Sequence, residues 1–362
     1  MSGARSPESA PAAAAGSVGR MQAVQLVAWE RPAEVRDVPT PVPAPGEVLL
    51  RVRGAGLCHS DLHLMHWPAG TVPYELPFTL GHEVAGTVEA LGDGVEGIEV
   101  GEAVLVYGPW GCGHCRRCAL GEEHLCERRE TRRGTACGIG RDGGLAEYVV
   151  VPSRLTVPLG GLDPVSAAPL ADAALTSYHA VKRALGQVPP GSTAVVIGVG
   201  GLGHVAVQLL KALGGCRIVA IDRREDALEA ARSGGADVTL PADGLTPHDV
   251  RHAAGGRAAL VMDFVGVDAT LELAAGCVAA GGHLSVVGVG GGTLPFRFGA
   301  IPFETTVVFS NWGTRAELAE VVALAQAGVL HLEVERVALH DVPDAYQRLE
   351  AGEVRGRVVA VP

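Results

Sequence analysis

The segment that most constrains the fold of this chain is VVIGVGGLGHVAVQLLKALG, residues 195–214. It places Gly198, Gly200 and Gly203 in the spacing G-x-G-x-x-G, between an apolar run typical of a buried strand and a helical pattern. In this spacing the first glycine permits a tight turn, the second lets the backbone approach a pyrophosphate, and the third lets helix and strand pack closely. The helix N-terminus then faces the anion. The segment predicts the strand, turn and helix of a dinucleotide-binding unit, with Gly201 in the same turn.

An acidic residue follows this turn at the distance that such a unit requires. The apolar run RIVAID ends in Asp222, 19 residues beyond Gly203, where a carboxylate would accept hydrogen bonds from the adenosine ribose hydroxyls. A carboxylate there also repels a 2′-phosphate, which favours NAD over NADP. Arg223 and Arg224 come next, and a guanidinium could tolerate some NADP. A turn that binds nothing is the alternative interpretation.

The length and spacing of the apolar segments predict two domains. Residues 164–310 alternate strand and helix patterns, which predicts an α/β domain with a Rossmann-type, doubly wound parallel sheet. Residues 21–163 carry short apolar runs between Pro- and Gly-bearing turns, which predicts a mainly β domain. The tail, residues 311–362, contains two helix and two strand patterns, and we expect it to pack back on the first domain. A chain of 362 residues that is 48% hydrophobic can fill two cores.

Charge and composition narrow the class of protein. The net charge of −11 opposes binding to nucleic acid or to anionic membranes. Residues 1–20 are small, polar or Pro-rich, which predicts a disordered leader without the apolar run of a signal peptide. No segment offers the roughly 20 apolar residues of a membrane helix. We therefore expect a cytoplasmic protein whose cysteines do not form disulfides.

Half of the eight cysteines fall in one short loop, WGCGHCRRCALGEEHLC. Four thiolates close a tetrahedron around Zn²⁺ and leave no position for water or substrate. An iron–sulfur site is an alternative, but the spacing lacks the three-residue gap and trailing proline of the bacterial ferredoxin run. A nucleic-acid-binding zinc module is opposed by the net charge. The pattern predicts a structural zinc lobe over residues 110–127, held by Cys112, Cys115, Cys118 and Cys126.

If that site is closed, catalysis needs an open metal site elsewhere. The segments GLCHSDLH, LGHEVAG and PLADAALTSYHA contribute Cys58, His82 and Asp172. Each residue alone could be an ordinary buried side chain. Together they would offer three zinc ligands and a free fourth position, the arrangement that activates a bound water or alcohol.

These motifs resemble those of zinc-dependent medium-chain alcohol dehydrogenases, and the pattern is most similar to bacterial secondary-alcohol dehydrogenases. The resemblance spans Met21 to Pro362. It rests on CHSD at 58–61, GHE at 81–83, the four-cysteine lobe, GGLAEY at 143–148, GVGGLG at 198–203, WGTR at 312–315 and GRVV at 356–359. It implies a GroES-like catalytic domain over 21–163, NAD as cofactor, and a homo-oligomer, for which we favour a tetramer over a dimer.

The resemblance also implies a metal set. Cys58, His82 and Asp172 would hold a catalytic zinc, and Glu83 stands where the family has a carboxylate that can replace the water ligand. The best-known members carry a cysteine in place of Asp172, so the aspartate favours the secondary-alcohol subgroup. Because a carboxylate is a harder ligand than a thiolate, we expect weaker zinc retention. With the lobe, this makes two zinc ions per chain.

The remaining implied roles concern the proton and the cofactor. Ser60 and His63 match a proton relay, and an imidazole has a pKa suited to that work. His59, Thr176 and Arg357 match positions that contact the cofactor. Zinc would lower the pKa of a bound alcohol, and a hydride would pass to the nicotinamide. Candidates to line the substrate pocket are Trp67, Trp110, Tyr178 and Trp312.

Three alternatives share parts of this pattern. A polyol dehydrogenase has the same fold and is the hardest to exclude. A double-bond reductase of the same superfamily generally lacks the zinc ligands. The third alternative is not an enzyme but a zinc-containing, dinucleotide-binding redox sensor. The preferred interpretation is an enzyme that interconverts a small alcohol and its ketone or aldehyde.

Overall fold

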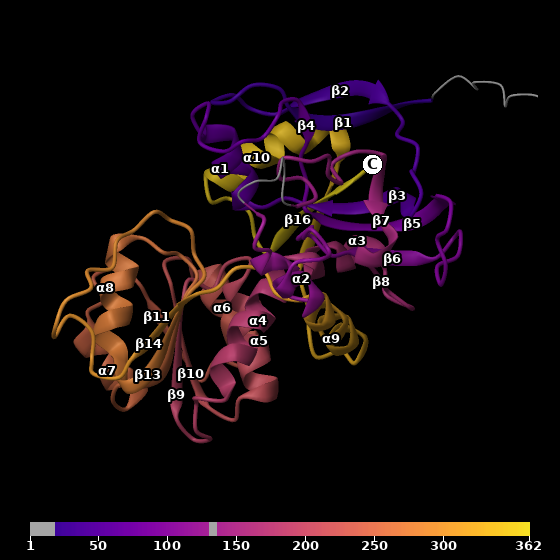
Figure 1. The fold of residues 1–362 in the computed structure, drawn as a ribbon. Coiled ribbons are helices and arrows are strands. Elements are labelled where there is room, and N and C mark those ends of the chain that lie inside the picture. The colour runs from indigo at the N-terminus through magenta and orange to yellow at the C-terminus, as the bar shows by residue number, and fades with distance from the viewer. Residues whose placement is uncertain (1–18, 130–135) are drawn as a thin grey trace, which may run out of the picture.

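The computed structural model describes residues 19–129 and 136–362, and it shows two domains side by side (Figure 1). Residues 1–18 of the predicted leader lie outside the described part. The first strand begins at Arg20, so the last leader residue already belongs to a sheet.

One domain contains the predicted parallel sheet. Its strand order is β11-β10-β9-β12-β13-β14 and every neighbouring pair is parallel, which confirms the doubly wound arrangement. Such strands are buried on both faces, so they are continuous apolar runs. In Figure 1, α4 and α5 lie on one side of the sheet and α7 and α8 on the other. The strands are β9 (Thr193–Ile197), β10 (Arg217–Asp222), β11 (Val238–Pro241), β12 (Ala258–Asp263), β13 (Val278–Val286) and β14 (Thr306–Phe309). The helices are α4 (Ala173–Leu185), α5 (Gly203–Leu213), α6 (Glu225–Ser233), α7 (Pro247–Ala254) and α8 (Asp268–Cys277).

The other domain is mainly antiparallel. A larger sheet has the order β15-β16-β3-β5-β6-β8, with β7 also paired to β3, and a smaller sheet has the order β2-β1-β4. The tail contributes β15 and β16, and β16 pairs antiparallel with β3. The strands are β1 (Arg20–Leu26), β2 (Glu34–Pro39), β3 (Glu47–Gly56), β4 (Phe78–Thr79), β5 (Glu83–Leu91), β6 (Ala103–Val106), β7 (Tyr148–Pro152), β8 (Thr156–Pro158), β15 (Val334–Ala338) and β16 (Arg357–Val361).

Short helices connect these layers and carry the site. The α-helices are α1 (His59–His66), α2 (Arg116–Ala119), α3 (Pro164–Ala167), α9 (Arg315–Gln326) and α10 (Val342–Glu350). The 3₁₀ turns are η1 (Glu123–Leu125), η2 (Ser153–Leu155), η3 (Ala168–Ala171) and η4 (Leu339–Asp341). The tail helix α10 packs against α1, and α9 packs against α4 (Figure 1). The turn η3 leads directly into α4 through a single residue, Asp172.

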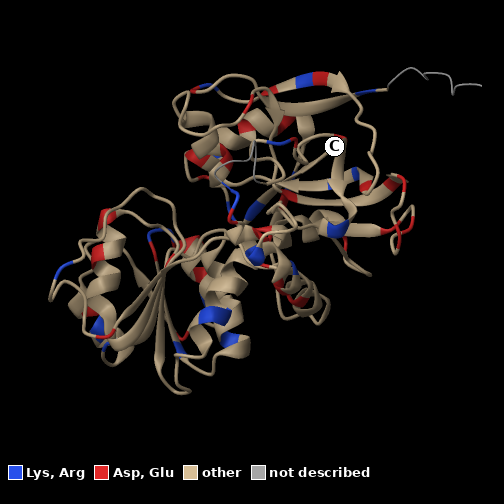
Figure 2. Ribbon diagram, in the orientation of Figure 1, with Lys and Arg blue, Asp and Glu red and all other residues tan. Residues whose placement is uncertain are grey.

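In Figure 2, charged residues fall on helices and loops and also on strands of the mainly antiparallel domain, such as β2. No helix in the described part of the chain is both long and apolar enough to cross a membrane.

Candidate active site

Three element boundaries bring Cys58, His82 and Asp172 together. Cys58 precedes α1, His82 precedes β5, and Asp172 precedes α4. One ligand atom of each lies within 4.8 Å of the others, and all three residues are buried. Oδ2 of Asp172 is 3.4 Å from Nε2 of His82 and 3.8 Å from Sγ of Cys58. Asp172 and His82 lie at ion-pair distance, but the contact does not have the geometry of a hydrogen bond. Nε2 of His82 is therefore a buried atom without a hydrogen-bond partner among residues 19–129 and 136–362. A sulfur, a nitrogen and a carboxylate oxygen that converge in this way fit Zn²⁺.

One residue that contacts a ligand of this cluster was not predicted from the sequence. Asp61 is fully buried, and its Oδ1 lies 3.3 Å from Nδ1 of His82. Metal-binding histidines usually direct their second ring nitrogen at such a carboxylate, which fixes the tautomer. The available signal was its place three residues after Cys58, where an acidic residue can close a capping box at a helix start.

Two further predicted residues contact the cluster or lie next to it. Thr176 donates a hydrogen bond from Oγ1 to Oδ1 of Asp172 at 2.7 Å. Oε1 of Glu83 accepts hydrogen bonds from Nη2 of Arg357 at 2.6 Å and from the backbone of Ala173 at 3.3 Å. Burial raises the pKa of Glu83 to about 7, against the lowering effect of the guanidinium. Glu83 is thus held in an ion pair, and it is not one of the residues that converge within 4.8 Å.

The proposed relay residues line the same space. Ser60 places Oγ 3.6 Å from Sγ of Cys58, and both Ser60 and His63 reach the main cavity. Burial, followed by the charge of His66, lowers the pKa of His63. Burial and then Arg357 lower the pKa of His59 as well. At neutral pH both imidazoles can therefore accept a proton.

One cavity of about 650 Å³ joins the cluster to the glycine turn. A second cavity of about 550 Å³ meets it at His59, Gly200, Gly201 and Arg357, and extends behind α5 and α6. The predicted site residues on the main cavity are Cys58, His59, Ser60, His63, Asp172, Thr176, Gly198, Gly200, Gly201, Gly203, Asp222 and Arg357. His82 is covered by its neighbours, and Glu83 is enclosed beside it.

The glycine turn has the geometry that its spacing predicts. Gly198 has a φ of +81°, which favours glycine. A Cβ on Gly203 would lie 1.9 Å from the carbonyl oxygen of Gly198, so helix and strand touch through glycine. Nothing lies within 4 Å of a Cβ built on Gly200, which leaves its backbone open to the cavity.

The carboxylate of Asp222 is held at the end of β10. It accepts hydrogen bonds from the backbone of Val199 at 2.8 Å and of Arg224 at 3.0 Å. The Arg224 side chain turns away: it pairs with Asp226 and donates from Nη1 to the carbonyl oxygens of Gly352 and Val354 at 2.9 and 2.7 Å. Arg223 is exposed.

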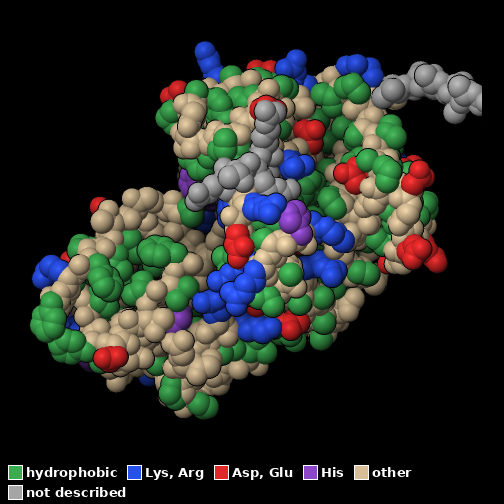
Figure 3. All heavy atoms as spheres, in the orientation of Figure 1, with side chains coloured by type: hydrophobic (Ala, Val, Ile, Leu, Met, Phe, Trp, Pro, Cys, Tyr) green, Lys and Arg blue, Asp and Glu red, His purple; other side chains and the backbone are tan. Residues whose placement is uncertain are grey.

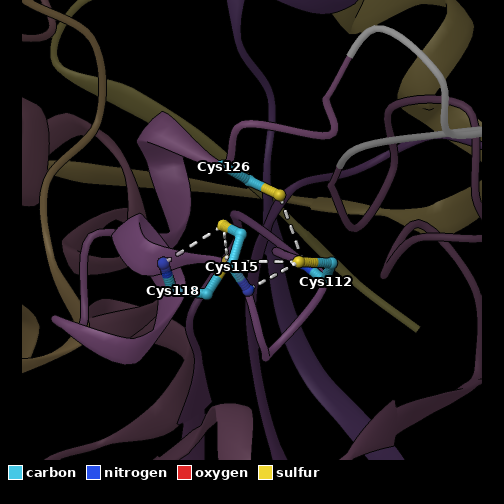
Figure 4. A group of neighbouring side chains, drawn as sticks. All are labelled: Cys112, Cys115, Cys118 and Cys126. Carbon is cyan, nitrogen blue, oxygen red and sulfur yellow. Dashed lines mark hydrogen bonds between the residues drawn. The ribbon is translucent and has the colours of Figure 1, made fainter.

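The four cysteines of the lobe form the second cluster (Figure 4). Their sulfurs all lie within 4.8 Å of one another, and none forms a disulfide. Sγ of Cys118 lies 3.4 Å from that of Cys115 and 3.9 Å from that of Cys112. Backbone N–H groups of the loop point at these sulfurs, as from Cys112 to Cys126 at 3.3 Å. The four donors fit a closed tetrahedral zinc site.

Of the four aromatic candidates, Trp312 lines the main cavity and the other three do not. Its ring lies 5.5 Å from that of His82, edge to face, and its φ is +56°, an unusual value for a bulky residue. Trp110 lies on a smaller space under the lobe. Tyr178 donates from its hydroxyl to Glu320 on α9 at 2.7 Å.

Comparisons with known proteins agree with this architecture. The alcohol dehydrogenase GroES-like domain matches residues 44–161, and the zinc-binding dehydrogenase family matches residues 201–327. An NAD-dependent alcohol dehydrogenase of Sulfurisphaera tokodaii is 37% identical over 355 residues, which cover 94% of this chain and 100% of that protein. The alcohol dehydrogenase structure from Aeropyrum pernix has a TM-score of 0.87 at 36% identity, covering 94% of this chain and 100% of that one. An acetophenone reductase from Geotrichum candidum, in complex with NAD, has a TM-score of 0.83 at 33% identity, covering 96% and 99%.

Both domains and their order along the chain are therefore those of a two-domain dehydrogenase. The chain belongs to the zinc-dependent medium-chain alcohol dehydrogenase family, and it is an oxidoreductase. The family resemblance inferred from the sequence is confirmed.

Proposed function

We propose that this protein oxidises small secondary alcohols reversibly to ketones, with NAD as the hydride acceptor and two zinc ions per chain. One observation carries the proposal: Cys58 and Asp172, two residues of the cluster that His82 completes, line the same cavity as the glycine turn. A substrate held at the cluster can therefore meet a cofactor held at the turn.

Each zinc ion and the NAD cofactor are assigned to residues whose chemistry suits them. Cys58, His82 and Asp172 hold the catalytic zinc, and the four lobe cysteines hold the structural one. When bound, zinc acts as a Lewis acid that lowers the pKa of the substrate hydroxyl, and NAD takes up the hydride. Thr176 restrains one oxygen of Asp172, which leaves Oδ2 directed at the cluster. The backbone N–H groups of the glycine turn face a pyrophosphate at the start of α5.

Ser60 and His63 are assigned to the route by which the proton departs. Ser60 lies beside Cys58 at the inner end of the cavity, and His63 lies one helical turn later on α1. A hydroxyl both accepts and donates, so Ser60 can pass a proton outward. His63, whose pKa is lowered by burial, receives it.

Selectivity for NAD is supported by Asp222 and Arg224 together. The carboxylate oxygens of Asp222 keep lone pairs for ribose hydroxyls after accepting two backbone hydrogen bonds. Arg224, which could have received a 2′-phosphate, is occupied by Asp226 and by two carbonyl oxygens. We therefore assign NADP a minor role.

The preference for secondary alcohols is supported by Asp172 at the third ligand position and by the substrate end of the cavity. Trp312 provides a large apolar wall there, packed edge to face on His82. The related acetophenone reductase takes its name from a methyl ketone. A methyl ketone and a simple secondary alcohol present small apolar groups to such a wall.

We also propose a homo-oligomer in the cytoplasm, a tetramer in preference to a dimer. The strand β14 forms one edge of the six-stranded sheet, and exposed phenylalanines lie on it and near it: Phe296, Phe298, Phe303 and Phe309 are 88%, 89%, 64% and 74% exposed. Figure 3 shows apolar side chains at the surface of this domain. An apolar sheet edge is a natural surface for pairing with a second copy. Reduced zinc-binding thiols suit a reducing compartment.

The proposal is tested by NADH formation from a panel of alcohols. Secondary alcohols such as 2-butanol should give higher kcat/KM than primary alcohols or sorbitol, and NAD should be preferred to NADP. Higher kcat/KM with sorbitol would assign the chain to the polyol enzymes. No NADH formation from any alcohol at any pH would favour the redox sensor.

A further inference from the structure

A tyrosine from the tail of the chain reaches the carboxylate beneath the zinc ligands. The hydroxyl of Tyr346, on α10, donates a hydrogen bond to Oδ2 of Asp61, on α1, at 2.9 Å. The two residues are 285 positions apart in the sequence, and α10 packs against α1 (Figure 1). Asp61 is fully buried and Tyr346 is 4% exposed. The contact is therefore a specific one inside the protein core.

The two carboxylate oxygens of Asp61 contact different residues. Oδ2 accepts the Tyr346 hydroxyl and also the backbone N–H of Cys58 at 3.0 Å, which caps the start of α1. Oδ1 faces His82, whose Nδ1 lies 3.3 Å away. The pair is close but lacks hydrogen-bond geometry, and both atoms are buried without a hydrogen-bond partner among residues 19–129 and 136–362. A proton kept on Nδ1 leaves the Nε2 lone pair free to face the metal.

We propose that Tyr346 is a positioning residue for the catalytic zinc, because its hydrogen bond fixes the rotation of the Asp61 carboxylate so that Oδ1 faces His82. A carboxylate held only by the N–H of Cys58 could turn about its Cβ–Cγ bond. Two donors on Oδ2, one from the start of α1 and one from α10, oppose that rotation. The inference rests on the proposed function, because it concerns the same metal site.

The hydroxyl of Tyr346 is a donor at all working pH values. Burial, followed by the negative charge of Asp61, raises the pKa of Tyr346 well above its usual value. Its oxygen therefore keeps its proton, and Oδ2 of Asp61 is the acceptor that the structure shows for it. This contact also links the C-terminal helix to the ligand His82 through one intermediate residue.

The test is the rate at which zinc leaves the holoenzyme in the presence of a chelator. Tyr346→Phe removes the hydroxyl and keeps the ring that fills the core. We expect one of the two zinc ions to leave about tenfold faster, at the lower end of the effect of groups that orient metal ligands. The zinc of the four-cysteine lobe should leave at the wild-type rate, so it serves as an internal reference.

Tyr178→Phe is the matched control. Tyr178 is also buried, and its hydroxyl also donates to a carboxylate, that of Glu320 at 2.7 Å. Neither residue belongs to either zinc cluster. This variant should release both zinc ions as the wild type does. Tyr346→Met is a second variant without a hydroxyl, for use if the phenylalanine variant does not fold.

A double substitution separates positioning from packing. Asp61→Asn should accelerate the loss of the same zinc ion and lower kcat with little change in KM for NAD, and Tyr346→Phe should add nothing in that background. Wild-type zinc release in folded Tyr346→Phe, or effects of the two substitutions that simply add, would overturn the inference. A wild-type protein without alcohol-dependent NADH formation would overturn the proposed function instead.

Discussion

Nη2 of Arg357 donates a hydrogen bond to Oε1 of Glu83 at 2.6 Å, and the two side chains are only 4% and 0% exposed. Glu83 begins β5 and Arg357 begins β16, so the pair ties the tail of the chain into the larger sheet. Arg357 also donates to the carbonyl oxygen of Leu57 at 3.0 Å, one residue before Cys58. A Cβ on Gly201 would lie 2.7 Å from its Nη1. The buried guanidinium of Arg357 thus contacts the larger sheet, the residue before the proposed zinc ligand Cys58, and the glycine turn.

Replacing Glu83 with glutamine should destabilise the protein strongly at pH 8. The pKa of Glu83 is about 7, raised by burial, so the carboxylate is charged at pH 8 and neutralises Arg357. An uncompensated buried charge costs about 3 kcal/mol or more, which urea unfolding would measure. Asp37→Asn is the control, because Asp37 pairs with Arg20 at the surface and an exposed pair contributes about 0–1 kcal/mol. Equal stability of the two variants would contradict a structural role for the pair.

Replacing Asp222 with alanine should weaken NAD binding and reduce the discrimination against NADP. The variant loses charge-assisted hydrogen bonds to the ribose and the repulsion of a 2′-phosphate, so KM for NAD should rise about 10- to 100-fold. Steady-state kinetics with both cofactors measure this. Since Arg224 is held by Asp226, Gly352 and Val354, KM for NADP should stay high. A wild-type KM for NAD would show that Asp222 does not contact the cofactor.

The fold was largely predictable because its signals are local. Strands buried on both faces have unbroken apolar runs, and the glycine spacing marks the turn after the first of them. The return of the tail to the first domain was predicted, but its strand pairing was not, because β16 pairs with β3 through Val359 with Gly56 and Ala360 with Ala55, far apart in the sequence. Such pairing is decided by burial of side chains from the whole sheet, and no short pattern records it.

The candidate site likewise contains residues that short sequence motifs reveal and residues that only the tertiary fold brings in. Residues in compact motifs, such as Cys58 or the lobe cysteines, were found from spacing and resemblance. Asp61 lies within the quoted motif CHSD, yet its contact with His82 depends on the tertiary fold, which places the start of α1 next to the residue before β5. Tyr346 has no signal in the sequence at all, because an ordinary apolar face of α10 brings it to Asp61. Sequence reasoning also offered Trp67, Trp110 and Tyr178 for the pocket, and aromatic residue type alone could not tell core from cavity.

Removing one thiolate of the lobe should cost stability more than chemistry. Cys118→Ala should release one zinc ion and lower Tm by about 5–10 °C, because loss of a structural metal is among the largest single effects on stability. The kcat of the folded protein should fall far less than in a variant of the open site. Cys277→Ala, which removes a buried sulfur outside both clusters, is the control and should keep both zinc ions. Loss of all activity in folded Cys118→Ala would assign the lobe a part in the reaction.

Acid should loosen the contact between α4 and α9 through Glu317. Burial opposes its charge, but hydrogen bonds from Nδ1 of His179 and the backbone N–H of Thr314, both at 2.8 Å, lower its pKa from 4.5 to about 2. A depressed folded-state pKa stabilises the protein above the unfolded pKa, and that stabilisation is lost as the pH falls from about 4.5 to 2. In Glu317→Gln, unfolding free energy should depend less on pH across this window. An unchanged pH dependence would contradict the account of this contact.

The ligand type at the open site can be varied directly. Asp172→Cys should keep its zinc longer than the wild type during chelation, because a thiolate is a softer ligand than a carboxylate. The time course of zinc content measures this, with the lobe zinc as reference. Faster loss of zinc from the cysteine variant would contradict the expectation that the carboxylate holds zinc more weakly.

The most direct measurement is zinc content together with alcohol-dependent NADH formation in wild type and Asp172→Ala. The account predicts two zinc ions per chain in the wild type. The variant should be folded by circular dichroism, hold one zinc ion, and form no NADH. A folded variant that keeps both ions and its activity, or a wild type that is active with the lobe zinc alone, would contradict the assignment of the reaction to Cys58, His82 and Asp172.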